Sequence, residues 1–375
     1  MRLEPFELER IQSEWEHVID INLTESGVEP LTISDLIPDK ETQRKLIETK
    51  LGYSQTNGTM PLREAISGMY QGADVNNVLV TNGGAEANFL VIWNLLHEHD
   101  AKEIVVMLPN YMQIPGIVKG LNGVVNPFHL KMEKGEWILD LEELKSAISK
   151  KTKAIAICNP NNPTGATFGP TYLKAIAEIA ADAHLWVISD EIYQGAELEG
   201  NPTPTMFEYY DKVIVTNSLS KAYGLPGLRL GWIICSVKSH VADLWAYSDY
   251  TTICPTKLSD TLATIALQPK LRKKILERTS RIVKKHWSIL REWLDERSGT
   301  FEYVAPKAAA ICFPRHNLCV SSLELTTRLL KEKSLLIIPG EHFGMPMHLR
   351  IGFGYEEDHL NAGLSRLDEM IRTLK

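Results

Sequence analysis

Short apolar runs rich in β-branched residues alternate with longer helical patterns along the first two-thirds of this chain. The runs NVLVT, EIVVML, KAIAIC, LWVIS and KVIVTN occupy residues 77–81, 103–108, 153–158, 185–189 and 212–217. Helical patterns cover residues 84–99, 139–150 and 172–183. Strands that are apolar throughout are typical of a sheet buried on both faces, and strands that alternate with helices usually pair in parallel. The sequence therefore predicts an α/β domain whose mostly parallel sheet is flanked by helices.

The alternation gives way near residue 265 to one long, charged, amphipathic helical pattern over residues 270–296, followed by a mixed strand and helix region. A chain of 375 residues is long enough for two domains. We therefore expect a second, smaller α+β domain. The predicted division is an N-terminal arm and part of the small domain (1–37), a large domain (38–264) and a small C-terminal domain (265–375).

Charge and cysteine content exclude several classes of protein. The formal net charge of -7 and the sequence pI near 5.9 argue against a nucleic-acid partner and favour a small molecule. The first twenty residues lack the apolar core of a signal peptide, and no later run is long enough to span a bilayer, which predicts a cytoplasmic protein without a membrane partner. Five cysteines without paired close spacing predict reduced thiols and no metal site.

Ligands of open α/β sheets collect at the carboxyl ends of the strands, so the residues there are functional candidates. Gly83 and Gly84 separate the first predicted strand from a helix, whose first amides suit a phosphate, although a tight turn alone also explains them. The Walker pattern and the full dinucleotide-binding pattern are both missing. Tyr111, between Pro109 and Pro115, either stacks on a planar ligand or packs its own loop.

Two further strand ends carry polar residues. CNPNNPTG, residues 158–165, contains three asparagines and two prolines, which turn chemistry explains or which direct amide donors off the sheet. Asp190 and Glu191 close the next strand, with Tyr193 two residues later. A carboxylate at this position needs a cation or a hydrogen-bond donor, or it caps a helix.

The fifth strand end holds a lysine. Lys221 lies in NSLSKAYGLPGLRLGW, close to Ser218, Ser220 and Arg229. Desolvation and a nearby cation both favour the neutral, nucleophilic form of a lysine amine, whereas most lysines are solvated surface residues. Because five such features occur at successive strand ends, the sequence favours one shared ligand site.

The chain resembles the fold-type I pyridoxal phosphate enzymes of the class I and II aminotransferase family. NPNNPTG, SDEIY and SLSKAYGLPGLRLGW match three motifs of that family in order, with YSQTNGTMPLREAI upstream and LRIGFG downstream, so the resemblance covers almost the whole chain. It implies a large domain with a mostly parallel seven-stranded sheet, a smaller α+β domain, and pyridoxal 5'-phosphate as cofactor.

The resemblance also implies a role for each matching residue. Lys221 would form the Schiff base with the cofactor, and Asp190 would keep the pyridine nitrogen protonated. Asn162 and Tyr193 would hydrogen-bond the phenolic oxygen of the ring, and Tyr111 would stack on it. The phosphate would be held by the following group: Gly83, Gly84, Ala85, Ser218, Ser220 and Arg229.

Two implied contacts depend on more distant stretches. Tyr53 resembles the tyrosine that reaches the phosphate of the neighbouring subunit, which implies a homodimer with shared active sites; the alternative is a tyrosine that packs its own loop. Arg350 resembles the arginine that binds the substrate α-carboxylate, and an internal ion pair is the alternative. Asn162 and Gly27 would complete the substrate site, with Gly27 between Ser26 and Val28 at its entrance.

The implied reaction transfers the amino group of an L-amino acid to a 2-oxo acid. The segments SGV, SKAYGLPGLRLGW and IIPGEHFG are also similar to capreomycidine synthase, a member of the superfamily that cyclises a hydroxylated arginine, so elimination and cyclisation or oxidation of an arginine-like amino acid is an alternative. Residues 22–36 and the pair Ala308 and Ala309 depart from the usual family pattern. No second arginine is clearly placed for a dicarboxylic substrate, although Arg315 is conceivable, and this favours a neutral or aromatic amino acid.

Two other classes of protein explain less of the sequence. A nucleotide-binding dehydrogenase accounts for the glycine turn but not for Lys221, Asp190 and Asn162 at three separate strand ends. A transcription regulator built on this fold needs a DNA-binding domain, for which the N-terminal segment leaves no room.

Overall fold

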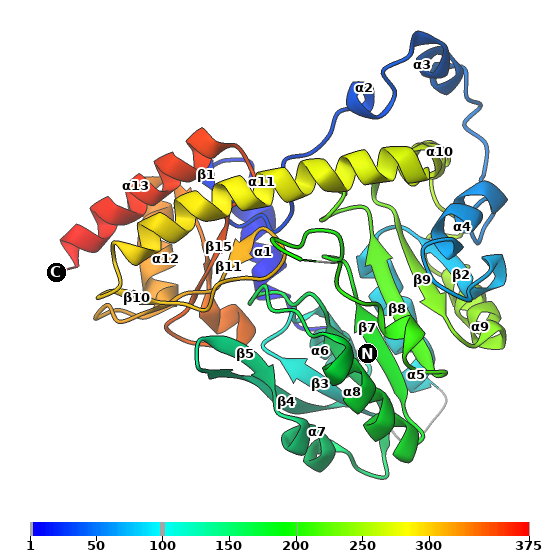
Figure 1. Cartoon of the computed structure of the whole chain (residues 1–375), viewed down its shortest axis with the longest axis horizontal. Helices are drawn as coiled ribbons and strands as arrows, with labels where there is room; N and C mark the ends of the chain where they lie inside the picture. The colour runs from blue at the N-terminus through cyan, green and yellow to red at the C-terminus, as the bar shows by residue number, and fades with distance from the viewer. Residues whose placement is uncertain (1–2, 98–101, 201, 375) are drawn as a thin grey trace.

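The computed structural model describes residues 3–97, 102–200 and 202–374. Figure 1 shows a large α/β body and a smaller body, with the long helix α11 running along both. The helices are α1 (Glu7–Trp15), α2 (Ile33–Leu36), α3 (Lys40–Ile47), α4 (Met60–Ser67), α5 (Gly84–His97), α6 (Gln113–Gly120), α7 (Leu141–Ala147), α8 (Pro170–Asp182), α9 (Lys238–Ser248), α10 (Lys257–Ala266), α11 (Pro269–Asp295), α12 (Ser322–Lys333) and α13 (Glu357–Thr373). Short 3-10 helices are η1 (Val75–Asn77), η2 (Met206–Glu208), η3 (Pro226–Leu228) and η4 (Gly340–Phe343).

The strands of the large body form one sheet in the order β2-β9-β8-β7-β6-β3-β4-β5. They are β2 (Val78–Thr81), β3 (Glu103–Leu108), β4 (Val124–Glu133), β5 (Glu136–Leu139), β6 (Thr152–Cys158), β7 (Trp186–Asp190), β8 (Val213–Ser218) and β9 (Gly231–Cys235). Pairing is parallel from β8 through β7, β6 and β3 to β4, whereas β9 is antiparallel to both β8 and β2. The sheet is therefore mostly parallel, as predicted.

The predicted number of seven strands is wrong, because the sheet formed by the described residues has eight. The additional strand is β5, which pairs antiparallel with the end of β4 through a two-residue turn at Lys134 and Gly135. Both turn residues have positive φ, 51° and 77°, as a tight hairpin requires. The chain therefore folds back and extends the sheet at its edge.

The predicted strands and helices of the large domain are confirmed. The five apolar runs form β2, β3, β6, β7 and β8, and the helical patterns form α5, α7 and α8. The pattern over residues 270–296 forms α11, while residues 98 and 99 of the first pattern lie outside the described residues. Strand β4 alternates buried and exposed residues near the sheet edge, which explains why it lacks the continuous apolar run of the central strands.

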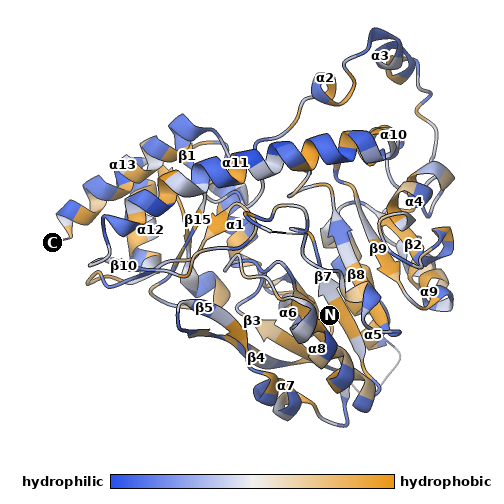
Figure 2. Cartoon of the chain, in the orientation of Figure 1, coloured by the Kyte–Doolittle hydropathy of each residue, from blue (hydrophilic) through white to orange (hydrophobic). Residues whose placement is uncertain are grey.

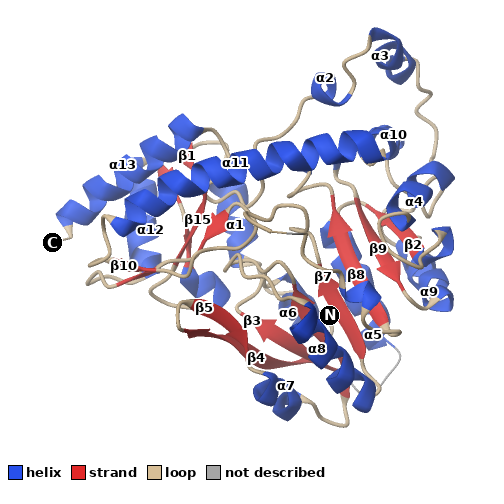
Figure 3. Ribbon diagram, viewed as in Figure 1, coloured by secondary structure: helices blue, strands red, loops and turns tan. Residues whose placement is uncertain are grey.

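Helices cover both faces of the sheet (Figure 3). On β3, Ile104 and Val106 pack with α5, α6 and α9 on one face, while Val105 and Met107 pack on the other face, in the core shared with α4, α8 and α10. Side chains alternate between the faces because successive residues of a strand point in opposite directions. Because helices cover both faces of the sheet, a ligand can reach it at the carboxyl ends of its strands.

The smaller body has its own core and includes N-terminal residues. Its strands are β1 (Ile21–Asn22), β10 (Phe301–Glu302), β11 (Ile311–Cys312), β12 (Arg315–His316), β13 (Leu335–Leu336), β14 (Ile338–Pro339) and β15 (Leu349–Gly352). Strand β1 pairs in parallel with β13. Along α11, Ile275 belongs to the core of the large body and Val283 to that of the small one, and Figure 2 shows hydrophobic residues interspersed with hydrophilic ones along this helix. The exact domain boundaries stay a prediction.

The segment over residues 40–53, which includes α3, projects from the large body (Figure 1), whereas Leu36 of α2 and the following Ile37 are buried in the core of that body. Three side chains of the projecting segment are largely exposed, with Ile47 84%, Leu51 78% and Tyr53 90% accessible. Among the described residues, none of the helices combines the length and apolar character needed to cross a membrane.

Candidate active site

The predicted strand ends meet in one pocket between the two bodies. Its floor comes from the segments that follow β2, β3, β6, β7 and β8, and its opposite wall from the N-terminal residues and β15. Strands of a parallel sheet end at the same edge, which brings these distant parts of the sequence together. Of the predicted site residues, the following line the pocket: Gly84, Ala85, Tyr111, Asn162, Asp190, Tyr193, Ser220, Lys221, Arg229 and Arg350.

Three predicted residues lie directly behind this lining. A Cβ on Gly27 would lie 3.4 Å from Cδ of Lys221, and a Cβ on Gly83 would lie 2.7 Å from Nη2 of Arg229. The Oγ of Ser218, a fully buried residue, accepts a hydrogen bond from the amide of Ser220 at 3.1 Å.

Tyr53 and Arg315 lie outside the pocket. Tyr53 is 90% exposed on the projecting segment. The half-exposed Arg315 side chain lies 4.0 Å from Glu302. It is not among the residues that line the pocket.

One end of the pocket is built around the start of α5. Gly83 has φ +84°, and a Cβ on Gly231 would lie 2.5 Å from the carbonyl carbon of Gly83, so both positions require glycine. Arg229 has a left-handed backbone with φ 46° and ψ 49°, a strained conformation for a residue other than glycine. The guanidinium of Arg229 thus lies beside Gly83, directly before the first residue of a 14-residue helix. This combination suits a phosphate.

Asp190 lies at the base of the pocket and is 9% exposed. Its Oδ2 accepts a hydrogen bond from Nδ2 of Asn88 at 3.2 Å, and its Oδ1 accepts one from the amide of Ile192 at 3.2 Å. Burial raises the pKa of the Asp190 carboxyl above its ordinary value. No cation among the described residues contributes to that shift. The site therefore suits a ligand that brings a positive charge to this carboxylate.

A hydrogen-bond network connects the floor to the opposite wall. The hydroxyl of Tyr193 accepts from Nδ2 of Asn162 at 3.1 Å and donates to Oγ of Ser26 at 2.9 Å. Arg350 donates from Nη1 to Oδ1 of Asn162 at 3.0 Å and from Nη2 to the carbonyl of Thr24 at 2.6 Å. Burial raises the pKa of Tyr193 and lowers that of Arg350. Asn162 and Tyr193, which are predicted to bind the cofactor ring, are therefore hydrogen-bonded in one network with Arg350, which is predicted to bind the substrate.

The guanidinium group of Arg350 has a donor left for a ligand. It is 2% exposed, and its Nε has no hydrogen-bond partner among the described residues. The described chain gives it no carboxylate ion-pair partner either, since its two hydrogen bonds go to neutral oxygens. The charges of Glu25 and Glu9 act on this guanidinium. A buried guanidinium without a direct carboxylate partner suits a ligand carboxylate.

The N-terminal segment reaches the pocket because two glycines of LRIGFG let it pass. A Cβ on Gly352 would lie 2.0 Å from the carbonyl oxygen of Glu25, and a Cβ on Gly354 would lie 2.0 Å from that of Gly27. Any larger residue would push residues 23–27 away from β15. These glycines therefore let the segment lie against β15, the strand that carries Arg350.

Lys221 follows β8 by three residues, and its amine has a partner that the sequence analysis missed. Its Nζ lies 3.7 Å from Oε2 of Glu25, with the two side chains 25% and 24% exposed. The expectation of a lysine influenced by desolvation and a nearby cation did not include this carboxylate. The amine and the carboxylate both face the pocket.

Helix α1 closes the pocket from the N-terminal side. Its contribution to the lining is Leu8, Glu9 and Gln12. The hydroxyl of Tyr111 donates to Oε1 of Glu9 at 2.6 Å, and its ring packs on Phe6 with centroids 4.9 Å apart. Tyr111 therefore connects α1 to the ligand pocket.

Sequence reasoning missed the following pocket residues: Glu9, Gln12, Glu25, Asn88 and Gln113. Asn88 did leave a signal, because it is a polar residue on the buried side of an otherwise apolar helix. Glu9 and Glu25 left none, since charged residues near the start of a chain are ordinary surface residues. Within residues 3–97, 102–200 and 202–374, no cluster of three or more His, Cys, Asp or Glu side chains is arranged to hold a metal ion.

Comparison with known proteins identifies the family. The profile of aminotransferase class I and II matches residues 22–367. The chain belongs to this family. It is a pyridoxal phosphate-dependent aminotransferase of fold type I, as the sequence predicted.

Individual relatives cover nearly the whole chain. An aspartate aminotransferase of Sulfurisphaera tokodaii is 31% identical over 88% of this chain and 85% of its own length. Capreomycidine synthase of Streptomyces vinaceus is 27% identical over 94% of this chain and 90% of its own length. The crystal structure of a pyridoxal phosphate-dependent aminotransferase from Streptococcus suis superposes with a TM-score of 0.92, at 32% identity, over 100% of this chain and 99% of that one.

The pocket fits the cofactor of this family. The cradle at the start of α5 matches a phosphate, and the buried Asp190 carboxylate matches a protonated pyridine nitrogen. Lys221 lines the same pocket as these two groups and as Arg350. The residues that line the pocket therefore fit pyridoxal phosphate, the cofactor of this family.

Proposed function

We propose that this enzyme moves the amino group of an L-amino acid to a 2-oxo acid, with Lys221 as its catalytic lysine. The observation that carries the proposal is Arg350, a buried cation whose Nε lacks a hydrogen-bond partner among the described residues. It lines the same pocket as Lys221 and Asp190. An α-amino acid has one carboxylate for this arginine and one amino group for the chemistry.

Pyridoxal phosphate, when bound, supplies an aldehyde for the amino group and a ring that accepts electrons from the α-carbon. The protein residues would divide the remaining tasks. Arg229, Ser218, Ser220 and the backbone of Gly83, Gly84 and Ala85 would hold the phosphate. Asp190 would keep the ring nitrogen protonated, Asn162 and Tyr193 would hydrogen-bond the phenolic oxygen, and Tyr111 would stack on the ring.

Proton transfer at the α-carbon falls to Lys221. Its amine lines the same pocket as the network of Tyr193, Asn162 and Arg350. Arg350 would fix the α-carboxylate through its planar fork, and Asn162 and Gly27 would complete the wall on which the substrate rests. An amine held within reach of the α-carbon can remove a proton and return it to a neighbouring atom.

We further propose that the enzyme is a homodimer with shared active sites. Exposure of Tyr53, Leu51 and Ile47 on the projecting segment supports a second copy that covers them. Tyr53 would then reach the phosphate cradle of that copy. A cytoplasmic location is also proposed, and it is supported by five free cysteines, because reduced thiols persist in reducing compartments.

The test combines spectroscopy with two substitutions. The purified protein loaded with pyridoxal phosphate is expected to show a yellow absorption band that bleaches when a substrate amino acid is added, and Lys221→Ala is expected to abolish turnover. Arg350→Lys keeps the charge but loses the fork, so KM for the amino acid is expected to rise about tenfold or more. Arg315→Lys, outside the pocket, is the matched control. Wild-type turnover by Lys221→Ala would refute the assignment.

A second candidate reaction is elimination and cyclisation, or oxidation, of an arginine-like amino acid. It is favoured by the 27% identity to capreomycidine synthase over 94% of this chain. The same Lys221 and Asp190 would serve, because both reactions begin with loss of the α-proton. Product analysis with arginine and its hydroxylated forms separates the two: transamination yields a 2-oxo acid, and cyclisation yields a ring that retains the nitrogen.

A further inference from the structure

The charged side chains of the pocket are not all used by the proposed function. Three cations and three anions line it: Lys221, Arg229, Arg350, Asp190, Glu9 and Glu25. The proposed function assigns the three cations and Asp190. Glu9 accepts a hydrogen bond from the hydroxyl of Tyr111 at 2.6 Å. Glu25 is therefore the pocket carboxylate whose task is still open.

The backbone fixes Glu25 between the two groups that an amino acid must meet. On one side, the carbonyl of Thr24 accepts from Nη2 of Arg350 at 2.6 Å, and on the other the Oγ of Ser26 accepts from Tyr193 at 2.9 Å. The Glu25 side chain lies 3.7 Å from Nζ of Lys221 and is three-quarters buried. A substrate with its carboxylate on Arg350 and its α-carbon near Lys221 has Glu25 beside it.

An ion pair joins Glu25 to Lys221. A lysine that holds the cofactor is no longer a free ammonium group. Glu25 then needs another cation, because a mostly buried carboxylate without one is costly. Among the described residues that line the pocket, the lysines and arginines are Lys221, Arg229 and Arg350, and the proposed function uses all three.

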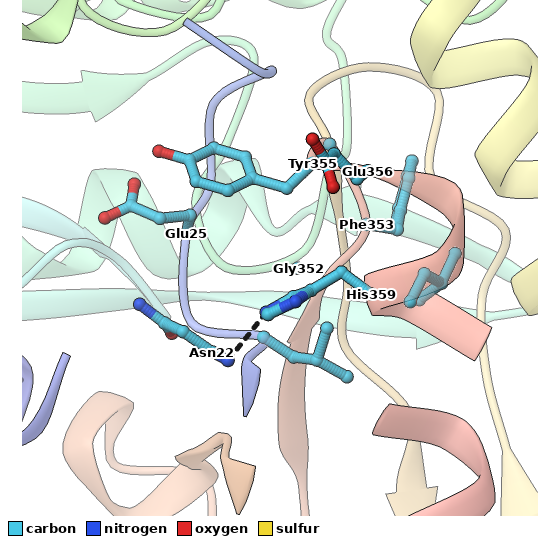
Figure 4. A pocket seen from close by; sticks show the side chains of 10 residues that line it. Asn22, Glu25, Gly352, Phe353, Tyr355, Glu356 and His359 are labelled. Carbon is cyan, nitrogen blue, oxygen red and sulfur yellow. Dashed lines mark hydrogen bonds between the residues drawn. The ribbon is translucent and has the colours of Figure 1, made fainter. Parts of the chain in front are cut away.

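Further negative charge surrounds the outer side of Glu25. Figure 4 shows Glu25, Tyr355 and Glu356 around a small adjoining pocket, with Asn22 donating its backbone amide to Nε2 of His359 at 3.0 Å. Burial raises the pKa of Tyr355, and the charges of Glu25, Glu29 and Glu16 raise it further. The potential on this side is therefore unfavourable for a second substrate carboxylate.

We propose that Glu25 recognises the substrate side chain and that the pocket takes an amino acid whose side chain carries a cation, either a guanidinium or an ammonium group. The inference rests on the proposed function and specifies its substrate class. It gives Glu25 the role that a second arginine has for a dicarboxylic substrate: the charge that pairs with the far end of the side chain. Aspartate and glutamate are poor substrates for the same reason.

The test compares arginine with citrulline, which has nearly the same shape but no charge, in single-turnover bleaching of the loaded enzyme. Wild type is expected to react with arginine with at least tenfold higher kcat/KM than with citrulline, mainly through KM. Glu25→Gln is expected to bring the ratio close to one, and Glu25→Asp to restore part of it. The ratio is informative because any effect of Glu25 on Lys221 applies to both amino acids.

A binding measurement removes turnover from the comparison. In a Lys221→Ala background loaded with cofactor, Glu25→Gln is expected to raise the dissociation constant of arginine at least tenfold more than that of citrulline. Glu208→Gln, which removes a charge at an exposed site outside the pocket, is the matched control and is expected to leave the ratio unchanged. Equal kcat/KM for arginine and citrulline in wild type, with alanine or another neutral amino acid reacting, overturns the inference and leaves the proposed function standing. No bleaching with any amino acid overturns both.

Discussion

Asn88 on α5 donates a hydrogen bond from Nδ2 to Oδ2 of Asp190 on β7, at 3.2 Å. The orientation of this amide is set by Thr216 on β8, whose hydroxyl donates to Oδ1 of Asn88 at 2.8 Å. Its NH2 group therefore faces the carboxylate. Three elements of the large body thus hold the carboxylate that would pair with the cofactor, and Asn88 is a positioning residue for it.

Asn88→Ala is expected to weaken cofactor binding about tenfold, because a buried carboxylate that loses a hydrogen-bond donor is destabilised by about 1–3 kcal/mol. The measurement is a fluorescence titration of the apo-protein with pyridoxal phosphate, together with the absorbance of the bound cofactor. Asn94→Ala on the same helix, away from the site, is the control. Unchanged cofactor affinity in Asn88→Ala would contradict the positioning role.

The hydroxyl of Tyr111 gives a prediction about α1. Tyr111→Phe keeps the ring but removes the 2.6 Å hydrogen bond to Glu9. A hydrogen bond to a charged group is worth about 1.5–3 kcal/mol, so amide exchange of α1 is expected to accelerate about tenfold or more. Cofactor affinity should change little, because the stacking ring remains. Tyr172→Phe on α8 is the control, and equal α1 protection in both variants would show that the contact does not hold the helix.

Sequence alone predicted the floor of the pocket and missed most of its wall, for a physical reason. Lys221, Asp190 and Asn162 follow apolar runs, and the shared polarity of parallel strands brings such positions together without knowledge of tertiary contacts. Glu25 and Glu9 reach the pocket only because β1 pairs with β13 and because Gly352 and Gly354 admit the N-terminal segment. Those contacts join opposite ends of the chain, which local patterns do not report.

The strand count failed for a related reason. The resemblance implied seven strands, and the apolar runs revealed only those buried on both faces. Strand β5 lies at the edge of the sheet and is short, and it exists because Lys134 and Gly135 adopt positive φ. A lysine-glycine pair in a charged stretch is a weak hairpin signal.

Glu191 predicts how stability depends on pH. It is 1% exposed, its Oε1 accepts from Ser189 and from the amide of Met206 at 2.8 Å each, and burial raises its pKa to about 7. The folded state binds the proton of the Glu191 carboxyl more tightly than the unfolded state does. The contribution of Glu191 to the free energy of unfolding is therefore fully present below the unfolded pKa near 4.5, and it is lost as pH rises through about 7.

Glu191→Gln mimics the protonated form and removes this dependence. Between pH 5 and pH 8, the unfolding free energy of the wild-type apo-protein should fall relative to that of the variant by about 3 kcal/mol. Urea unfolding at a series of pH values measures it. Asp190, whose pKa is also raised by burial, affects both proteins and cancels in the difference. Glu208→Gln, at an exposed site nearby, is the control, and parallel wild-type and Glu191→Gln curves would disprove the assignment.

The 90% exposure of Tyr53 and the position of Lys221 in the pocket give a test of shared sites. If Tyr53 serves the neighbouring subunit, a mixture of Tyr53→Ala and Lys221→Ala chains forms hybrids in which one site has both residues and the other has neither. Random reassociation of equal amounts makes half of the dimers hybrid, so about a quarter of wild-type activity is expected. Each variant alone should show less, since every Lys221→Ala site lacks its amine and every Tyr53→Ala site binds the phosphate weakly. The outcome that would contradict shared sites is an activity of the mixture equal to the mean of the two separate variants, which would mean that Tyr53 serves no other subunit.

Sedimentation of the mixture before and after reassociation verifies that hybrids form.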